Sequence, residues 1–280
     1  MKVSMVVVGL TVVSFATSAP ELIVSVYSSL TGHSDIALGN VIGSNIANVT
    51  LVLGVTALIF PLAFQKRLYR FDLPMMLFAS ALFGVFLYSD SDLNFFEGFC
   101  FVLLLCFLTI YLIRYSQNND NVSFDKNIQQ TSLIKMLLYI IFGGGCLYLG
   151  SGWLVDGASG IARSIGVSER IISVSIVSFG TSVPEFAASI IAALKKEKDL
   201  SIGNLIGSNI FNVFAVLGIT SMIQPIQVVD KGLIHNDLWW MFGAALILYP
   251  LMFFFHKGHI GRIEGFLLFL FYLTYIILLF

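Results

Sequence analysis

A block of about fifty residues occurs twice in this chain, which is the pattern of a duplicated structural unit. The segment SFATSAPE at positions 14–21 is matched by SFGTSVPE at 178–185, and GNVIGSNIAN at 39–48 is matched by GNLIGSNIFN at 203–212. Every matched pair is 164 positions apart, and Gly54 with Gly218 and Pro61 with Pro225 keep that spacing. The fold must therefore contain the same pair of elements twice.

The composition indicates an integral membrane protein. Hydrophobic residues make up 58% of the 280 residues and charged residues 11%, against the roughly 25% charged residues of a soluble domain. A net charge of −1 argues against a nucleic-acid partner and against a polybasic patch for lipid headgroups. We expect the lipid bilayer as a partner, and no protein partner is predicted.

Apolar segments of about twenty residues are needed to cross the hydrocarbon core of a bilayer. Breaks rich in charged or turn residues divide this chain into nine such segments, which predicts an all-α polytopic membrane protein. The predicted helices cover residues 3–30, 36–60, 73–88, 93–113, 136–162, 171–194, 200–223, 238–255 and 263–280.

The two copies of the block are predicted to have opposite orientations in the membrane. Five helices, an odd number, separate the start of the first copy from the start of the second. Cytoplasmic loops carry an excess of Lys and Arg. With the N-terminus inside, all basic residues except Arg163, Arg170 and Lys231 fall on the inner side. We therefore expect an inverted repeat in the cytoplasmic (inner) membrane, with the C-terminus outside.

The repeat also predicts the domain organisation. Residues 1–116 form a first membrane half of four helices around the block at about 9–61, residues 117–132 a polar cytoplasmic linker, and residues 133–280 a second half of five helices around the block at about 173–225. The first half has no counterpart of the helix at 136–162, so the chain looks short of an N-terminal helix. The helix at 136–162 spans about 40 Å and should tilt.

Polar side chains lie deep in these apolar segments. Glu185 follows Arg170 by 15 residues and precedes Lys195 by 10, which places it near mid-membrane at 1.5 Å per residue. An ionised carboxylate there costs at least about 2.5 to 3.5 kcal/mol, so something must offset the cost. Residues four apart share a helix face, and this spacing joins Thr17 with Glu21, Thr181 with Glu185, Ser44 with Asn48, and Ser208 with Asn212.

Pro20 and Pro184 should break or kink their helices, because proline lacks an N–H and clashes with the carbonyl four residues earlier. The residue before each proline is also pushed out of helical geometry. Carbonyls around 14–17 and 178–181 can then face a ligand, as half-helix ends do in inverted-repeat transporters. Glycine pairs at 39/43 and 203/207 would allow the close approach of neighbouring helices.

The donor atoms in this constellation are oxygens. Two carboxylates with hydroxyl, amide and carbonyl groups, and without His or Cys, suit Ca²⁺ or Na⁺ rather than zinc or copper. The charges of Glu21 and Glu185 would neutralise one Ca²⁺ or leave room for several Na⁺. Competition of the two ions for one set of carboxylates is a sufficient mechanism for exchange.

At these residues the chain resembles the α-repeats of the sodium/calcium exchanger family, of the prokaryotic type, within the cation/calcium antiporter superfamily. The family pattern, G-T-S-x-P-E followed by G-N-x-I-G-S-N-I, is matched closely by the second copy, whereas the first has Ala16 in place of the usual Gly. The resemblance implies ten helices in two inverted halves, ions bound at mid-membrane between the repeats, and alternating access. It also implies two long tilted helices that slide as a gate; the segment at 136–162 looks like one, and the chain lacks the other.

The resemblance also implies the roles of site residues, carried over by motif. Glu21 and Glu185 would be the main Ca²⁺ carboxylates; Thr17, Ser18, Thr181 and Ser182 would supply hydroxyl or backbone oxygens, Ser44 and Ser208 Na⁺ ligands, Asn48 and Asn212 the facing amides, and Ser14 and Ser178 carbonyl ligands for Na⁺. Some members of the family have Asp at the position of Asn212. With Asn there the site has one fewer titratable group, which leaves the coupling ion and the stoichiometry open.

The sequence thus predicts a secondary antiporter that exchanges Ca²⁺ for Na⁺, without a cofactor and without enzymatic activity. A membrane hydrolase would need a His at membrane depth, an HExxH helix or an aspartate pair, and the sequence contains none of these. A continuous pore fits an inverted repeat with a closed carboxylate site less well. A Ca²⁺/H⁺ antiporter and an inactive fragment truncated at the N-terminus are the alternatives. Asp156, which lies outside the motifs, either lines an entrance or sits at the membrane interface.

Overall fold

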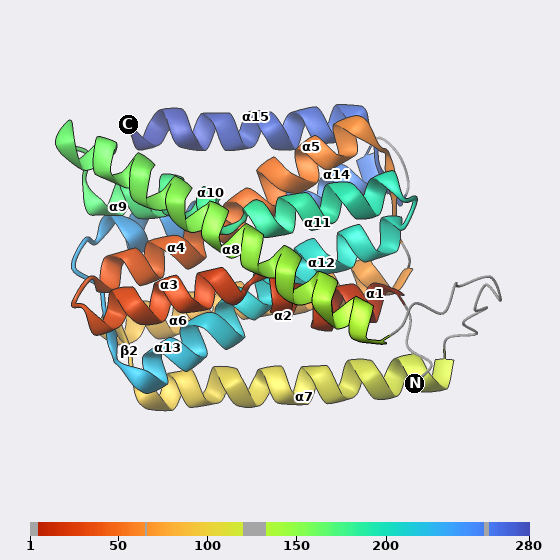
Figure 1. Ribbon diagram of the computed structural model, residues 1–280, viewed down its shortest axis with the longest axis horizontal. Coiled ribbons are helices and arrows are strands. Elements are labelled where there is room, and N and C mark those ends of the chain that lie inside the picture. Colours follow the sequence, from red (N-terminus) through yellow and green to blue (C-terminus); the bar gives the residue numbers. More distant parts are fainter. Residues whose placement is uncertain (1–4, 65, 120–132, 255–257) are drawn as a thin grey trace.

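Helices form almost all of the described structure (Figure 1). The computed structural model describes residues 5–64, 66–119, 133–254 and 258–280. The helices of the first half, in which η marks short π-helical segments, are α1 (Met5–Val8), η1 (Gly9–Val13), α2 (Ser14–Thr17), α3 (Ala19–Leu30), α4 (Ser34–Ala47), η2 (Asn48–Val52), α5 (Leu53–Ile59), η3 (Leu68–Asp72), α6 (Leu73–Asp90) and α7 (Phe95–Asn119).

The second half repeats this order after one additional long helix. Its helices are α8 (Leu133–Ser164), α9 (Glu169–Ile172), η4 (Ser173–Val177), α10 (Ser178–Thr181), α11 (Val183–Leu194), α12 (Lys198–Phe211), η5 (Asn212–Leu217), α13 (Gly218–Ile223), η6 (Leu233–Asp237), α14 (Leu238–Phe254) and α15 (Arg262–Leu279). Most of the predicted linker, residues 120–132, lies outside the described residues, so the domain boundaries stay predictions.

Long apolar helices lie where the sequence predicts membrane spans. Among the described residues, five helical segments are long and apolar enough to cross a membrane, and two further segments qualify if each bent helix pair is one span. The additional helix α8 has 32 residues and covers the predicted segment at 136–162. Helix α14 with 17 residues covers 238–254 of the segment predicted at 238–255. The chain is therefore a multi-pass membrane protein, and the predicted total of nine spans stays a prediction.

Contacts between the halves confirm that the repeat is inverted. Figure 1 shows α3 and α11 running in opposite directions, as do α4 and α12. The second helix of each block packs against the first helix of the other: α12 contacts α1, η1 and α2, while α4 contacts α9, η4 and α10. Likewise α5 lies against α15, and α13 against α7. These exchanged contacts are those of two copies related by a twofold axis.

Two short antiparallel ribbons repeat the same symmetry. Strand β1 (Leu62–Ala63) pairs with β4 (His259–Ile260), and β2 (Asp92–Leu93) pairs with β3 (Ile226–Gln227). Residues Leu62 and Ile226, which follow the two repeat blocks, are 164 positions apart. Each ribbon connects the end of a central helix in one half to a peripheral hairpin of the other.

The second helix of each block forms the centre of the molecule. In the most apolar stretch of the spans Ser34–Ile59 and Lys198–Ile223, 78% and 83% of the residues are buried. The corresponding shares in Phe95–Tyr115 and Arg262–Leu279 are 22% and 28%. Central helices buried on all sides must pair their polar groups inside the protein. The outer helices α7 and α15 are left to face lipid.

Glycines allow the central helices to approach the first helix of the opposite copy, as the small-residue pairs predict. A Cβ atom built on Gly207 would lie 2.3 Å from the Ser14 Oγ and 2.7 Å from the Leu10 Cα. At the equivalent position, a Cβ on Gly43 would lie 2.3 Å from the Val174 carbonyl oxygen and 2.5 Å from the Ser178 Oγ. No side chain fits at either point without moving backbone.

The long helix α8 packs differently. Its 32 residues correspond to about 48 Å, and Figure 1 shows it running obliquely across α10 and α11, which it contacts. Cβ atoms built on its glycines at 143, 145, 150, 152, 157 and 160 would meet no heavy atom within 4 Å. This helix therefore lies over the second half without close backbone contact at these positions.

We predict that Gly207→Ala destabilises the protein and that Gly157→Ala does not. The added methyl group at Gly207 has no space, and overpacking of this kind typically costs about 1–3 kcal/mol. At Gly157 the methyl group meets open space and favours the helix. The melting temperature of each purified variant in detergent measures the difference, and equal melting temperatures would contradict the close approach.

Candidate cation-binding site

A break in the first helix of each block positions the two glutamates. In the first copy the chain leaves helical geometry at Ser18, with φ −83° and ψ 6°, and α2 and α3 are bent by 48°. In the second copy the break falls at Ser182 and the bend between α10 and α11 is 41°. The predicted breaks at the prolines are confirmed. Glu21 and Glu185 lie in the first turn after each break, where unpaired backbone N–H groups favour negative charge.

Each carboxylate is hydrogen-bonded by the opposite repeat. Ser18 Oγ donates to Glu185 Oε1 at 3.0 Å, and Ser182 Oγ donates to Glu21 Oε1 at 3.4 Å. Ser208 Oγ also donates to Glu185 Oε1, at 3.3 Å. Both glutamates are fully buried and interact electrostatically with each other. The structure thus brings together two carboxylates whose sequence positions are 164 apart.

Four buried oxygens of the predicted ligand residues have no hydrogen-bond partner among the described residues. They are Oε2 of Glu21, Oε2 of Glu185, Oδ1 of Asn48 and Oδ1 of Asn212. All four side chains are 0% exposed. An unpaired buried acceptor loses its hydration without compensation, so this set of oxygens is suited to a desolvated cation. The four form two pairs related by the repeat.

Two further asparagines orient the amides of Asn48 and Asn212. Asn212 Nδ2 donates to Asn45 Oδ1 at 3.1 Å, and Asn48 Nδ2 donates to Asn209 Oδ1 at 3.3 Å. Because the nitrogen of each amide is held by the opposite repeat, its oxygen is left to face away from that partner. The sequence interpretation did not assign Asn45 or Asn209 a role, although both occur in the repeated text at a spacing of 164.

Asn40 and Asn204 are a second pair that the sequence interpretation missed. Thr181 Oγ1 donates to Asn40 Oδ1 at 2.9 Å, and Thr17 Oγ1 to Asn204 Oδ1 at 3.2 Å. The amide nitrogens of these asparagines in turn donate to Ser25 Oγ and Ser189 Oγ, respectively. The threonine hydroxyls therefore also have protein partners across the repeats. The spacing of 164 between Ser25 and Ser189 was the signal that could have identified this network.

Oxygens of the predicted ligand serines already have hydrogen-bond partners within the protein. The hydroxyl of Ser44 lies 3.4 Å from Thr181 Oγ1 and 3.3 Å from the Ser178 carbonyl oxygen. The carbonyls of Ser14 and Ser178 accept hydrogen bonds from the N–H groups of Ser18 and Ser182, at 2.9 and 3.1 Å. These two carbonyls, expected to be freed by the helix breaks, are therefore shared with the backbone. Their role as Na⁺ ligands stays a prediction.

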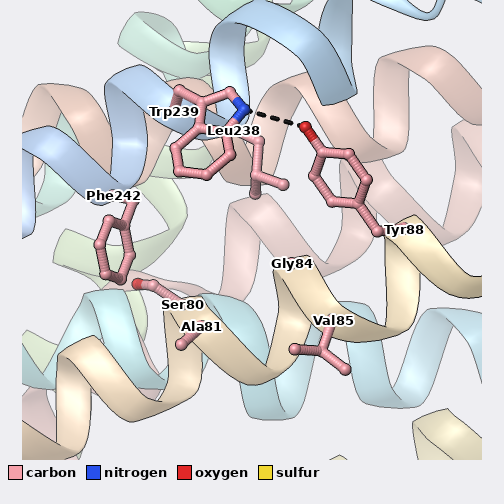
Figure 2. Close-up of a pocket in the computed structure, with 8 residues that line it drawn as sticks. All are labelled: Ser80, Ala81, Gly84, Val85, Tyr88, Leu238, Trp239 and Phe242. Atoms are coloured by element: carbon pink, nitrogen blue, oxygen red, sulfur yellow. Dashed lines mark hydrogen bonds between the residues drawn. The ribbon is translucent and has the colours of Figure 1, made fainter.

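A separate cavity of about 390 Å³ lies between α6 and α14, and none of the predicted ligand residues lines it. Figure 2 shows its lining, in which Trp239 Nε1 donates to the Tyr88 hydroxyl at 2.9 Å. The remaining lining residues are Ser80, Ala81, Gly84, Val85, Leu238 and Phe242. None of these eight side chains is charged, and none belongs to the repeated motifs.

Comparison with known proteins agrees with this geometry. The family model described as "Sodium/calcium exchanger protein" matches residues 1–114 and 135–280. The chain is 36% identical to CaxA of Alkalimonas amylolytica, covering 100% of this chain and 89% of that protein. It is 30% identical to the sodium/calcium exchanger MaX1 of Methanosarcina acetivorans, with 99% and 89% covered.

A solved structure has the same fold. It is the sodium-calcium exchanger NCX_Mj, soaked with 10 mM Na⁺ and zero Ca²⁺, which superposes with a TM-score of 0.78 at 30% identity and covers 99% of this chain and 88% of its own. The family match covers nearly the whole chain, and the fold and the repeated motifs agree with it. The chain therefore belongs to the sodium/calcium exchanger family of membrane transporters.

Proposed function

We propose that this chain is a secondary antiporter that exchanges Ca²⁺ for Na⁺ by alternating access, with both ions bound between the two repeats. The observation that carries the proposal is the set of four buried oxygens without a partner, two from carboxylates and two from amides. Hard-oxygen sets of this kind suit Ca²⁺ and Na⁺. Similarity to the exchangers MaX1 and NCX_Mj supports the same ion pair.

The charges of Glu21 and Glu185 determine how much cation charge the site can bind. Glu21 and Glu185, when ionised, carry two negative charges on fully buried side chains, and the repulsion between them must be offset. One Ca²⁺ neutralises both, and so do two Na⁺. Because each cargo satisfies the same carboxylates, binding of one ion excludes the other. The ion gradients supply the driving force, so the proposed mechanism requires no cofactor and no chemical step.

Loop charge supports an orientation for this transport. The outer side would hold only Arg163, Arg170 and Lys231 of the basic residues, which favours an N-terminus inside and a C-terminus outside. We propose that the protein lies in this orientation in the cytoplasmic membrane. Ca²⁺ would then move outward as Na⁺ moves inward.

We predict that Glu185→Gln abolishes Na⁺-driven Ca²⁺ uptake. The amide keeps the shape of the side chain but removes one of the two charges that balance Ca²⁺. Initial rates of ⁴⁵Ca²⁺ uptake into Na⁺-loaded proteoliposomes, with and without an outward Na⁺ gradient, measure the effect. Glu197→Gln is the matched control, because Glu197 is exposed and lies outside the site.

The same vesicles separate the two candidate coupling ions. Uptake by the unaltered protein that follows the Na⁺ gradient and ignores an imposed pH gradient is expected. Uptake that follows the pH gradient and ignores Na⁺ would replace the proposal with Ca²⁺/H⁺ exchange. Retention of full activity in Glu185→Gln would remove the site from either mechanism.

We predict that Ser208→Ala raises the Na⁺ concentration needed for half-maximal exchange roughly tenfold, because the variant loses a predicted hydroxyl ligand of Na⁺ and about 1.4 kcal/mol of binding free energy corresponds to tenfold in affinity. Ser208 Oγ donates to Glu185 and is a predicted Na⁺ ligand. Ser221→Ala is the control, since Ser221 is equally buried but donates to the Gly218 carbonyl. Half-maximal Na⁺ concentrations from the uptake assay decide the point, and equal values in both variants would contradict it.

A further inference from the structure

Two methionines contact the asparagines that orient the candidate ligands. Met76 of α6 and Met241 of α14 are buried, and neither belongs to the repeated blocks. Asn209 Nδ2 donates to Met76 Sδ at 3.3 Å, and Asn45 Nδ2 donates to Met241 Sδ at 3.7 Å. A thioether sulfur is a weak acceptor and has no hydrogen to donate. Each sulfur therefore favours the amide orientation in which the nitrogen, and not the oxygen, faces it.

The two asparagines differ in their dependence on the sulfur. Asn45 Nδ2 has a second acceptor, the backbone carbonyl of Asn209, at 3.2 Å. In the part of the chain that the structure describes, Asn209 Nδ2 has no acceptor other than the sulfur of Met76. Asn45 would therefore keep its orientation without a sulfur, whereas the orientation of Asn209 depends on one.

The orientation of Asn209 determines that of a candidate ligand. Asn209 Oδ1 accepts from Asn48 Nδ2 at 3.3 Å, and Asn48 Oδ1 is one of the buried oxygens without a partner. If the amide of Asn209 turned over, its nitrogen would face the nitrogen of Asn48, and two donors would meet. Asn48 would then have to turn as well, which would put its nitrogen where its free oxygen now lies. An amide nitrogen is a donor and does not bind a cation.

We propose that Met76 is a positioning residue of the cation site, whose sulfur holds Asn209, and through it Asn48, in the orientation that offers an oxygen to the ion. The inference rests on the proposed cation exchange. Met76 acts on the fraction of molecules in which Asn48 Oδ1 is available as a ligand. The apparent dissociation constant rises in proportion as this fraction falls, so loss of the sulfur weakens ion binding while the charge of the site stays the same.

Met76→Leu should raise the KM for Ca²⁺ roughly three- to tenfold, the change expected when the competent fraction falls to between about one third and one tenth. The kcat should be unchanged, as for a loss of uniform binding. Leucine conserves the volume of methionine but has no acceptor. Met241→Leu is the matched control and should leave the KM unchanged, because Asn45 retains the Asn209 carbonyl. Initial ⁴⁵Ca²⁺ uptake rates over a range of Ca²⁺ concentrations give both constants.

A second variant separates hydrogen bonding from packing. Met76→Gln supplies a carbonyl acceptor on a side chain of similar length, but it also buries a polar group, which costs stability. Its melting temperature in detergent should therefore lie below that of Met76→Leu, while its KM for Ca²⁺ should return toward that of the unaltered protein. The rise in melting temperature with added Ca²⁺ measures affinity without transport and should rank the variants in the same order as the KM.

An unchanged KM in Met76→Leu, or an equal increase in both leucine variants, would overturn the role of the sulfur. A KM for Met76→Gln above that of Met76→Leu would also overturn it, since affinity would then follow packing and not the acceptor. Failure of the unaltered protein to bind and exchange Ca²⁺ would instead overturn the proposed function.

Discussion

Two fully buried glutamates that repel each other are the constraint on which the rest of the structure depends. Separated from water, neither carboxylate is stable without compensating partners. The hydroxyl that bonds Glu185 through Ser18 comes from the first repeat, and the one that bonds Glu21 through Ser182 comes from the second. Neither half can therefore complete the site alone. Any change in the relative position of the two broken helices alters the partners of both carboxylates together. Under the proposed exchange, this would couple ion occupancy to the arrangement of the repeats.

Many of the buried polar side chains hold the candidate ligands in place and are not candidate ligands themselves. Asn45 and Asn209 hold the amide nitrogens of Asn212 and Asn48, and this fixes which atom of each amide remains without a partner. The glycines at 43 and 207 bring the helices close enough for such bonds. A site held by packed neighbours loses less entropy when an ion binds. The same packed residues therefore bring the helices together and fix which oxygens are available to a cation.

The fold could be predicted largely from the sequence, and the site only in part. The spacing of 164 indicated the inverted repeat, because a duplication is visible in the sequence itself. Pro20 and Pro184 indicated the helix breaks, because the proline ring removes a backbone N–H whatever the surroundings. The π-helical segments that begin at Asn48 and Asn212 follow no residue pattern, because they differ from α-helix only in hydrogen-bond register. Whether Asn45 or Asn48 offers an oxygen depends on helix rotation, which packing decides. The Ser14 carbonyl was expected to be free, but the chain re-forms a backbone bond before the break.

The approach to the site is less symmetric than the site itself. Thr17 and Thr181 are equivalent within the twofold arrangement, yet Thr181 lines a cavity of about 410 Å³ between α3 and α8, and Thr17 is not part of that lining. The equivalent phenylalanines at 15 and 179 are 60% and 40% exposed. An inverted repeat offers the same ligands toward both sides of the membrane, so the repeats alone cannot decide which side has access. Under the proposed exchange that decision falls to elements outside the symmetric core, and α8, with open space at its glycines and Asp156 in the cavity wall, is such an element.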